Sequence, residues 1–334
     1  MKVSVASQQQ DRTFPTGGKV RDVMRRAGGR EAALIPVLAL AITIGAFVSP
    51  AFLTPGNLIG ILQQAAALSL VVLAQTIILI AGKFDLSQES VVGLAPMAAA
   101  VAMLGGLPPL LGLALCLAIG AVIGAGNGFL VVKLRLNAFI VTLAVLILVR
   151  GLTLAINDGE TVVDLPESFV FLGSARFFGI PVSVILVVLI YVAVGIVLRY
   201  HRIGRAIYAI GGNARAAKAA GIRVERVVWG AFIFGGLMAA LAGILLAGRL
   251  ESTSAVSGQN MIFTVFAACV IGGVSLNGGA GSLLGAVLGV LILGVFQNIL
   301  TLSQVSSFFV DASFGAIILI ALIVTRFTSG ERSE

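Results

Sequence analysis

Few residues of this chain could carry out covalent chemistry, and they are scattered along it. His201 is the only histidine, and Cys116 and Cys269 lie within apolar runs, outside any CxxC or Cys/His pattern that holds a metal. The sequence contains no triad, no carboxylate pair of defined geometry and no G-x-x-x-x-G-K-[ST] phosphate loop. We therefore expect no catalytic residue, no metal, no bound cofactor and no ATP hydrolysis by this chain itself.

Two ionisable residues beside or inside apolar runs are the better candidates for function. Asp85 adjoins one run and Arg150 lies well inside another, and an ionisable group at membrane depth is costly enough to suggest a functional role. Each also has a structural alternative. Lys83 could neutralise Asp85 or Glu89 in an ion pair, which we favour, and Arg150 could extend to the membrane interface as an anchor.

The composition indicates a membrane protein built from helices. Hydrophobic residues make up 59% of the chain, charged residues make up 11%, and the mean hydropathy is +1.10. The longer runs are apolar on every face, whereas strands of a membrane barrel would alternate. Backbone polar groups in the bilayer must bond internally, which helices achieve. We expect an all-α polytopic fold.

The apolar windows predict about ten spans, including a third at 86–104, an eighth at 260–275 and a tenth at 308–325. The predicted organisation is a basic tail (1–31), a transmembrane domain (32–326) that includes a loop at 199–226, and a second tail (327–334). Lysine and arginine collect on one side, which places both termini in the cytoplasm. The basic first tail is more readily explained as this topology signal than as a nucleic-acid site, so no nucleic-acid partner is expected.

The third and eighth spans depart from regular long helices. The third contains Pro96, and the eighth ends in a glycine-rich run at 272–281. Interrupted helices are tolerated where they line a cavity or lie within protein, so both could border a solute path. Close helix packing is the favoured explanation for most glycines, as at Gly285 and Gly289.

The loop at 199–226 is predicted to contain a short helix. Asn213 is a suitable N-cap, the alanines that follow favour helix, and Gly221 suits a left-handed terminating residue. About two turns are marginal in isolation, so partner contacts should stabilise them. From the residues alone, docking into another protein and lying on anionic lipid headgroups remain equally open.

Four stretches in order resemble one family. YAIGGNARAAKAAGI (208–222) resembles the coupling-loop signature of the ribose, xylose, arabinose and galactose permeases of ABC importers. NAFIVTLAVLILVRG (137–151), VIGGVSLNGGAGSLLGAVLGVLILG (270–294) and GKFDLSQES (82–90) resemble three further blocks, the last with Lys83 and Glu89 at positions where the family has glycine. The resemblance covers roughly residues 55–325.

This resemblance implies a permease in the bacterial inner membrane with several partners. They are a cytoplasmic ATP-binding-cassette subunit, a periplasmic solute-binding protein, a second permease subunit in a homodimer or heterodimer, and the lipid bilayer. The expected ATPase-coupling residues are Arg205, Gly211, Gly212, Asn213, Ala214, Ala217 and Gly221. The candidate translocation path comprises Asp85, Ser87, Asn127, Phe139, Thr142, Arg150, Ser275 and Asn298, although bonding between helices is the simpler role for its neutral amides and Thr142.

The function expected from the whole sequence is import of a sugar or related small polar solute. The alternative is an ion-coupled secondary transporter, which needs a carboxylate near the bilayer midplane, and Asp85 is its main candidate. A membrane-embedded enzyme would need a reactive constellation that the sequence does not provide. Which sugar or polyol is carried does not follow from the sequence.

Overall fold

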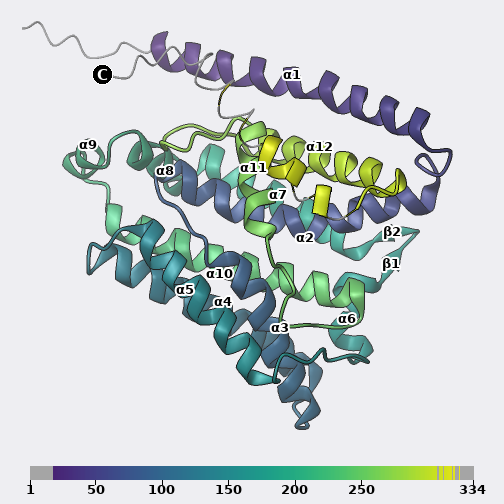
Figure 1. The fold of residues 1–334 in the computed structure, drawn as a ribbon. Coiled ribbons are helices and arrows are strands. Elements are labelled where there is room, and N and C mark those ends of the chain that lie inside the picture. Colours follow the sequence, from purple (N-terminus) through teal and green to yellow (C-terminus); the bar gives the residue numbers. More distant parts are fainter. Residues whose placement is uncertain (1–17, 307, 311, 318, 320–322, 324–334) are drawn as a thin grey trace, which may run out of the picture.

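The computed structural model describes residues 18–306, 308–310, 312–317, 319 and 323 (Figure 1). These residues form a helical bundle with one small hairpin, which confirms the all-helical class. The elements, in order, are α1 (Gly18–Val48), α2 (Pro55–Ile80), α3 (Gln88–Leu104), α4 (Pro109–Val132), α5 (Ala138–Ile156), α6 (Glu167–Ser174), β1 (Arg176–Phe177), β2 (Ile180–Pro181), α7 (Val182–Tyr200), α8 (Arg202–Gly212), α9 (Ala214–Ala219), α10 (Val224–Leu250), α11 (Met261–Ile271) and α12 (Leu283–Leu302).

Seven helices in the described part of the chain are long and apolar enough to span a membrane, so the predicted count of about ten is not confirmed. The third and eighth predicted spans correspond to the shorter helices α3 and α11, with 17 and 11 residues. A further short apolar helix, Phe308–Ile317, lies in the predicted tenth span, most of whose remainder is outside the described residues. Both predicted tails lie wholly or largely outside them too, except that α1 already begins at Gly18.

The long helix α10 forms the centre of the bundle. It packs against α2, α3, α4 and α6, and most residues of α2 and α3 are buried. In Figure 1, α3, α4 and α5 lie on one side of α10, while α2, α12 and the outermost helix α1 lie on the other. The core is therefore built around α10 and α2, which most other elements contact, with α3 packed against α10.

Glycines allow α4 and α10 to approach closely. Gly120 faces the backbone of Gly236, Gly124 faces the backbone of Phe232, and a Cβ at either position would collide with a carbonyl oxygen. On the other side of the bundle, Gly285 and Gly289 of α12 lie in the same way against α11. Small residues let helix backbones meet where no hydrophobic effect drives them together in lipid, and the packing role predicted for Gly285 and Gly289 is confirmed.

Non-helical backbone connects the shorter helices. At about 1.5 Å per residue, α11 is about 16 Å long, roughly half the thickness of a ~30 Å hydrocarbon layer. α11 alone is therefore too short to cross such a layer, and the segments 251–260 and 272–282 flank it. They are packed into the protein: Gly258 lies against Glu89 and Val92 of α3, and the amide of Gly279 donates to the carbonyl of Ile80 over 2.9 Å.

The two ends of the bundle carry different connections. Figure 1 shows α8 and α9 at one end, and α6 with the β1–β2 hairpin at the other. The residues that the sequence assigns to coupling therefore lie together at one end. The segment that precedes α6 is acidic, with Asp158, Glu160 and Asp164, and belongs to the opposite end.

Candidate coupling surface and translocation path

The helix predicted after Asn213 is present as the six-residue helix α9. The Asn213 side chain accepts hydrogen bonds from the amides of Arg215 and Ala216, each over 3.0 Å. At the other end Gly221 has φ +83°, its amide donates to the carbonyl of Lys218, and the amide of Ile222 donates to that of Ala217. This is a Schellman motif, so both predicted ends of the helix are confirmed.

A second helix, α8, precedes α9 and was not predicted from the sequence. The Nδ1 atom of His201 accepts from the amide of Ile203 over 3.2 Å and so caps its first turn. Ala206, Ile207 and Ile210 are buried on one face, and Arg202, Arg205 and Ala209 are exposed on the other. The loop is therefore a pair of short helices, of which α8 is anchored to the bundle.

Four glycines form a junction where α8 meets the bundle, and we call Gly82, Gly211, Gly278 and Gly279 the glycine junction. A Cβ at Gly211 would collide with the carbonyl oxygen of Ile80 and with the amide nitrogen of Gly279. A Cβ at Gly278 would lie 2.8 Å from Cα of Gly82 and 3.0 Å from the carbonyl oxygen of Gly211. Backbone from three segments thus meets without intervening side chains: the α2–α3 connection, the end of α8 and the α11–α12 loop.

A hydrogen bond supports the same junction from α8. The Tyr208 hydroxyl donates to the carbonyl of Gly281 over 2.9 Å. Burial raises the pKa of Tyr208 above its ordinary value, with the nearby acid Glu31 acting in the same direction. The Tyr208 phenol is therefore neutral at physiological pH, and its hydrogen bond to Gly281 does not depend on pH in that range.

The predicted coupling residues divide into an exposed and an anchoring set. Arg205, Gly212, Asn213, Ala214 and Gly221 are exposed, so a partner could contact them. Gly211 is committed to the glycine junction, and Ala217 is only 4% exposed because it packs within the chain's own core. In this structure Ala217 packs inward, and its coupling role stays a prediction. The small residues that α9 does present are Ala214, Ala216 and Ala219.

Half of the predicted path residues form one buried polar cluster. Asp85 Oδ1 accepts from the amide and the hydroxyl of Ser87, over 3.0 and 2.6 Å. The Asn127 amide donates to the Ser87 hydroxyl over 2.7 Å, and Thr142 Oγ1 accepts from the amide of Leu86 over 3.1 Å. All four side chains are at most 1% exposed. The cluster fixes the irregular α2–α3 connection against α4 and α5, which supports the structural role favoured for Asp85.

The remaining path residues lie elsewhere. Asn298 exchanges two hydrogen bonds with Asn57 of α2, over 2.8 and 2.9 Å, which is bonding between helices. Ser275 is in the α11–α12 loop, where its amide donates to the carbonyl of Ala280. Phe139 is half exposed, with its ring edge-to-face with Phe84 at 6.3 Å between centroids. The structure therefore does not bring the eight predicted residues into one passage.

Arg150 has a partner that the sequence did not suggest. Its Nη2 donates to Oε1 of Glu89 in an ion pair, and Oε2 of Glu89 accepts from the amide of Ile262 over 3.2 Å. The predicted pairing of Lys83 with Asp85 or Glu89 was wrong, since within the described residues the ion pair joins Glu89 to Arg150. Arg150 also turns inward to Glu89, whereas an interfacial anchor would extend along the lipid.

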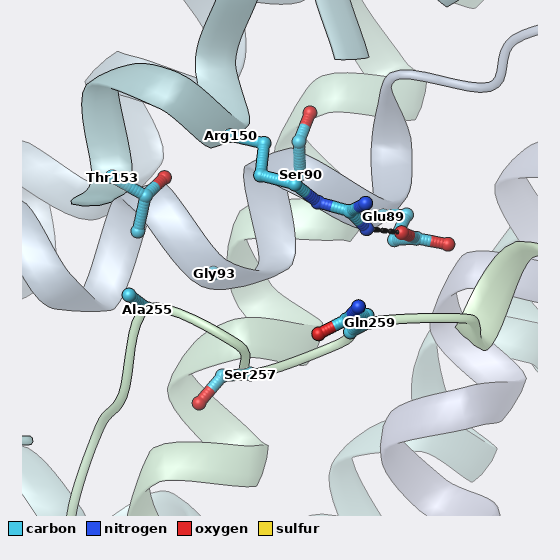
Figure 2. A pocket seen from close by; sticks show the side chains of 8 residues that line it. All are labelled: Glu89, Ser90, Gly93, Arg150, Thr153, Ala255, Ser257 and Gln259. Atoms are coloured by element: carbon cyan, nitrogen blue, oxygen red, sulfur yellow. Dashed lines mark hydrogen bonds and ion pairs between the residues drawn. The ribbon is translucent and has the colours of Figure 1, made fainter. Parts of the chain in front are cut away.

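A small notch adjoins this ion pair. Figure 2 shows Arg150 directed toward Glu89, with Gln259 beside the pair on the loop that precedes α11. The notch has a volume of about 10 Å³, and its lining also includes Ser90, Gly93, Thr153, Ala255 and Ser257. Most lining side chains are polar or small. Neither Glu89 nor Gln259 was among the predicted site residues, because each reaches the notch only through tertiary packing.

Comparison with known proteins assigns the family. Residues 57–325 match the model described as branched-chain amino acid transport system / permease component. The ribose import permease protein RbsC of Bacillus subtilis is 38% identical over 291 residues, which cover 86% of this chain and 90% of the relative. The L-arabinose transport system permease protein AraH of Escherichia coli is 37% identical over 302 residues, covering 88% and 90%. An L-arabinose ABC transporter permease protein AraH of Azospirillum brasilense is 32% identical over 315 residues, covering 94% and 91%.

These matches cover most of the chain and of each relative. The chain belongs to this family of ABC importer permeases, as its four motifs predicted, and its apolar helices make it a multi-pass membrane protein. Family membership also identifies a transport subunit rather than an enzyme, with the ATPase on a separate subunit. It favours the ABC importer over the ion-coupled alternative.

Proposed function

We propose that this chain is the translocation subunit of an ABC importer for a neutral sugar, working as a dimer with ATP-binding subunits and a solute-binding protein. The glycine junction carries the proposal. It joins the exposed α8–α9 segment by direct backbone contact to the α2–α3 connection and to the α11–α12 loop. A partner that moves α9 would thereby act on both irregular segments.

Close packing makes such a transmission efficient. Backbone atoms in van der Waals contact cannot be compressed, so a displacement of α8 must shift Gly279 and Ile80 or break their contacts. Flexible side chains at the same place would absorb part of the movement. The α11–α12 loop follows α11, and the amide of Ile262 in the first turn of α11 donates to Glu89, which lines the notch beside Arg150. The proposed path of coupling runs from α9 through the junction to α11.

The proposed orientation places α8 and α9 in the cytoplasm. The segment from Arg199 to Arg226 is strongly basic, and cytoplasmic loops carry an excess of lysine and arginine. The acidic segment before α6 is at the other end of the bundle and would face the periplasm, where the solute-binding protein docks. Both termini are then cytoplasmic. Replacing Ala214 with cysteine and labelling intact cells and inverted vesicles tests this orientation, since α9 should react only in the vesicles.

The proposed solute class follows from the relatives. The names of the similar permeases specify ribose and L-arabinose, whereas the matching family model is described by branched-chain amino acids. The similarity to pentose permeases over nearly the full chain favours a sugar. In addition, the ionic groups of the central region are neutralised or hydrogen-bonded, as in Glu89 with Arg150. A neutral hydroxyl-bearing solute suits such surroundings better than a zwitterion.

Reconstitution tests the proposal. The tagged permease would be co-expressed with its ATP-binding and solute-binding proteins and assayed in proteoliposomes for ATP hydrolysis and uptake. Ribose, L-arabinose, D-xylose, D-galactose and L-leucine form the panel of solutes. We expect the ATPase to copurify and a sugar to stimulate both activities. Stimulation by leucine alone would overturn the solute class, and uptake driven by an ion gradient without ATP would overturn the mechanism.

A further inference from the structure

Glu89 connects three helices through one carboxylate. It lies in the first turn of α3, it is 3% exposed, and its two oxygens accept from the guanidinium of Arg150 in α5 and from the amide of Ile262 in α11. The positive end of the α11 dipole points at the same group. A buried carboxylate is tolerated only with such compensation, so the three elements are held in one arrangement.

The ion pair between Glu89 and Arg150 also determines the net charge of the notch. Arg150 is only partly covered, since 36% of its side chain is exposed, and it lines the notch beside Gln259 and Ser257. With Glu89 ionised, the pair contributes no net charge, while the guanidinium keeps further N–H donors. Without Glu89, the notch would present an uncompensated cation. Its polarity for hydrogen bonding and its net charge are therefore set by different residues.

The size of the notch limits what it can hold. A cavity of about 10 Å³ is close to the minimum that one water molecule needs. A single hydroxyl group of a passing solute is of the same size. Carboxylate and phosphate groups are larger and bring a full negative charge, for which the neutral pair offers no net attraction.

We propose that Glu89 is a positioning and specificity-determining residue, which holds Arg150 beside the start of α11 and keeps the notch neutral so that it receives hydroxyl groups and discriminates against anions. This inference rests on the proposed function, because it assumes that solute passes the notch. It identifies the solute class as neutral and polyhydroxylated.

The electrostatic part can be measured without any transported solute. Gln259→Cys places a thiol at the notch, and its rates of reaction with an anionic sulfonate-bearing and a cationic trimethylammonium-bearing methanethiosulfonate are compared in the assembled importer. Val256→Cys is the matched control, because Val256 is exposed on the same loop but does not line the notch. The native Cys116 and Cys269 are buried, and the chain without an added cysteine measures their background reaction.

Glu89→Gln should raise the anionic-to-cationic rate ratio at position 259 by at least about threefold, because one charge at roughly 6 Å in water changes each of the two rates about threefold, in opposite directions, before salt screening reduces the effect. The ratio at position 256 should change less. The double variant Glu89→Gln with Arg150→Gln should return the ratio at 259 to its original value, which a purely structural loosening would not do. An unchanged ratio in Glu89→Gln, or no return in the double variant, would overturn the inference, and neither result bears on whether the chain is a sugar permease.

Discussion

Gly211 of α8 lies against the carbonyl oxygen of Ile80, the last residue of α2, with no space for a side chain between them. Ile80 is fully buried, and its carbonyl also accepts from the amide of Gly279. One carbonyl group thus contacts both the coupling segment and the α11–α12 loop. The next residue, Gly212, has free space where a Cβ would lie. Substituting the two glycines separately therefore tests the contact of Gly211 with Ile80.

Gly211→Ala should impair coupling. The added methyl must displace α8 from Ile80 and Gly279, and overpacking of this kind costs about 1–3 kcal/mol. We expect lower ATP-driven uptake at matched expression, together with weaker solute stimulation of the ATPase. Both are measured in proteoliposomes that contain the complete importer.

Gly212→Ala is the matched control. A Cβ at position 212 meets no atom within 4 Å, and its φ is not in the left-handed region. The two variants add the same methyl group to adjacent residues of one helix end. Because Gly212 is itself an exposed residue of the predicted coupling set, unimpaired uptake by both variants is the result that would show that contact with Ile80 and Gly279 does not matter for transport.

Asn213→Ala should destabilise α9. The substitution removes the acceptor for the amides of Arg215 and Ala216, and loss of an N-cap costs about 1 kcal/mol. Because α9 has only six residues, we expect faster amide hydrogen exchange over residues 214–222 in the isolated permease. Asn213→Asp keeps the side-chain acceptor and should exchange at nearly the original rate. Slow exchange in Asn213→Ala would mean that packing of Ala217 alone stabilises the helix.

The sequence predicted those features that depend on neighbouring residues. Asn213 and Gly221 predict the two ends of α9, because helix capping depends only on residues within about one turn of the end. The glycine-rich composition of the run after α11 likewise predicts a break in the helix. The structure confirms this break, with positive φ at Gly273, Gly278 and Gly279. The family motifs, which occur in the same order as in the family, additionally predicted the class of protein.

The features that were missed depend on distant residues. Glu89 and Ile262 are 173 positions apart in the chain, so neither the helix cap nor the ion pair with Arg150 is visible in local patterns. Burial of Ala217 depends on packing within the bundle, and an alanine-rich helix gives no sign of which alanine turns inward. The α8 helix was missed because Gly204, Gly211 and Gly212 lower its intrinsic propensity, while tertiary packing stabilises it.

Gln75→Leu should stabilise the protein. Gln75 is fully buried in α2, and neither its amide nitrogen nor its oxygen has a partner within the described residues. Replacing an unpaired buried amide by a leucine of similar size removes a desolvation penalty of about 1–3 kcal/mol. We expect a higher apparent Tm of the permease in detergent.

Asn298→Leu provides the opposite case. Asn298 and Asn57 bond to each other, so the substitution leaves Asn57 Oδ1 without its donor, while Asn57 Nδ2 keeps its bond to the carbonyl of Phe52. We expect a lower apparent Tm, since both hydrogen bonds between α2 and α12 are lost and one partly buried acceptor is left without a partner in the chain. A rise for Asn298→Leu or a fall for Gln75→Leu would show that bound water or lipid changes the balance at that site.

The exposed face of α9 provides the sharpest test of partner docking. Ala216 is exposed and Ala217 is buried, although they are adjacent and of the same type. Ala216→Glu should therefore leave the permease folded while adding bulk and negative charge to the surface that we assign to the ATPase. We expect less ATPase retained on the tagged permease and lower uptake, with an unchanged apparent Tm of the isolated subunit.

Ala217→Glu should act differently, because a carboxylate forced into the core beneath α9 lowers the stability of the subunit itself. Its loss of uptake would accompany a lower apparent Tm, whereas that of Ala216→Glu would not. The comparison separates a docking surface from a folding requirement within two neighbouring residues. Full ATPase retention and full uptake by Ala216→Glu would place the docking surface elsewhere, with the exposed face of α8 around Arg205 as the next segment to substitute.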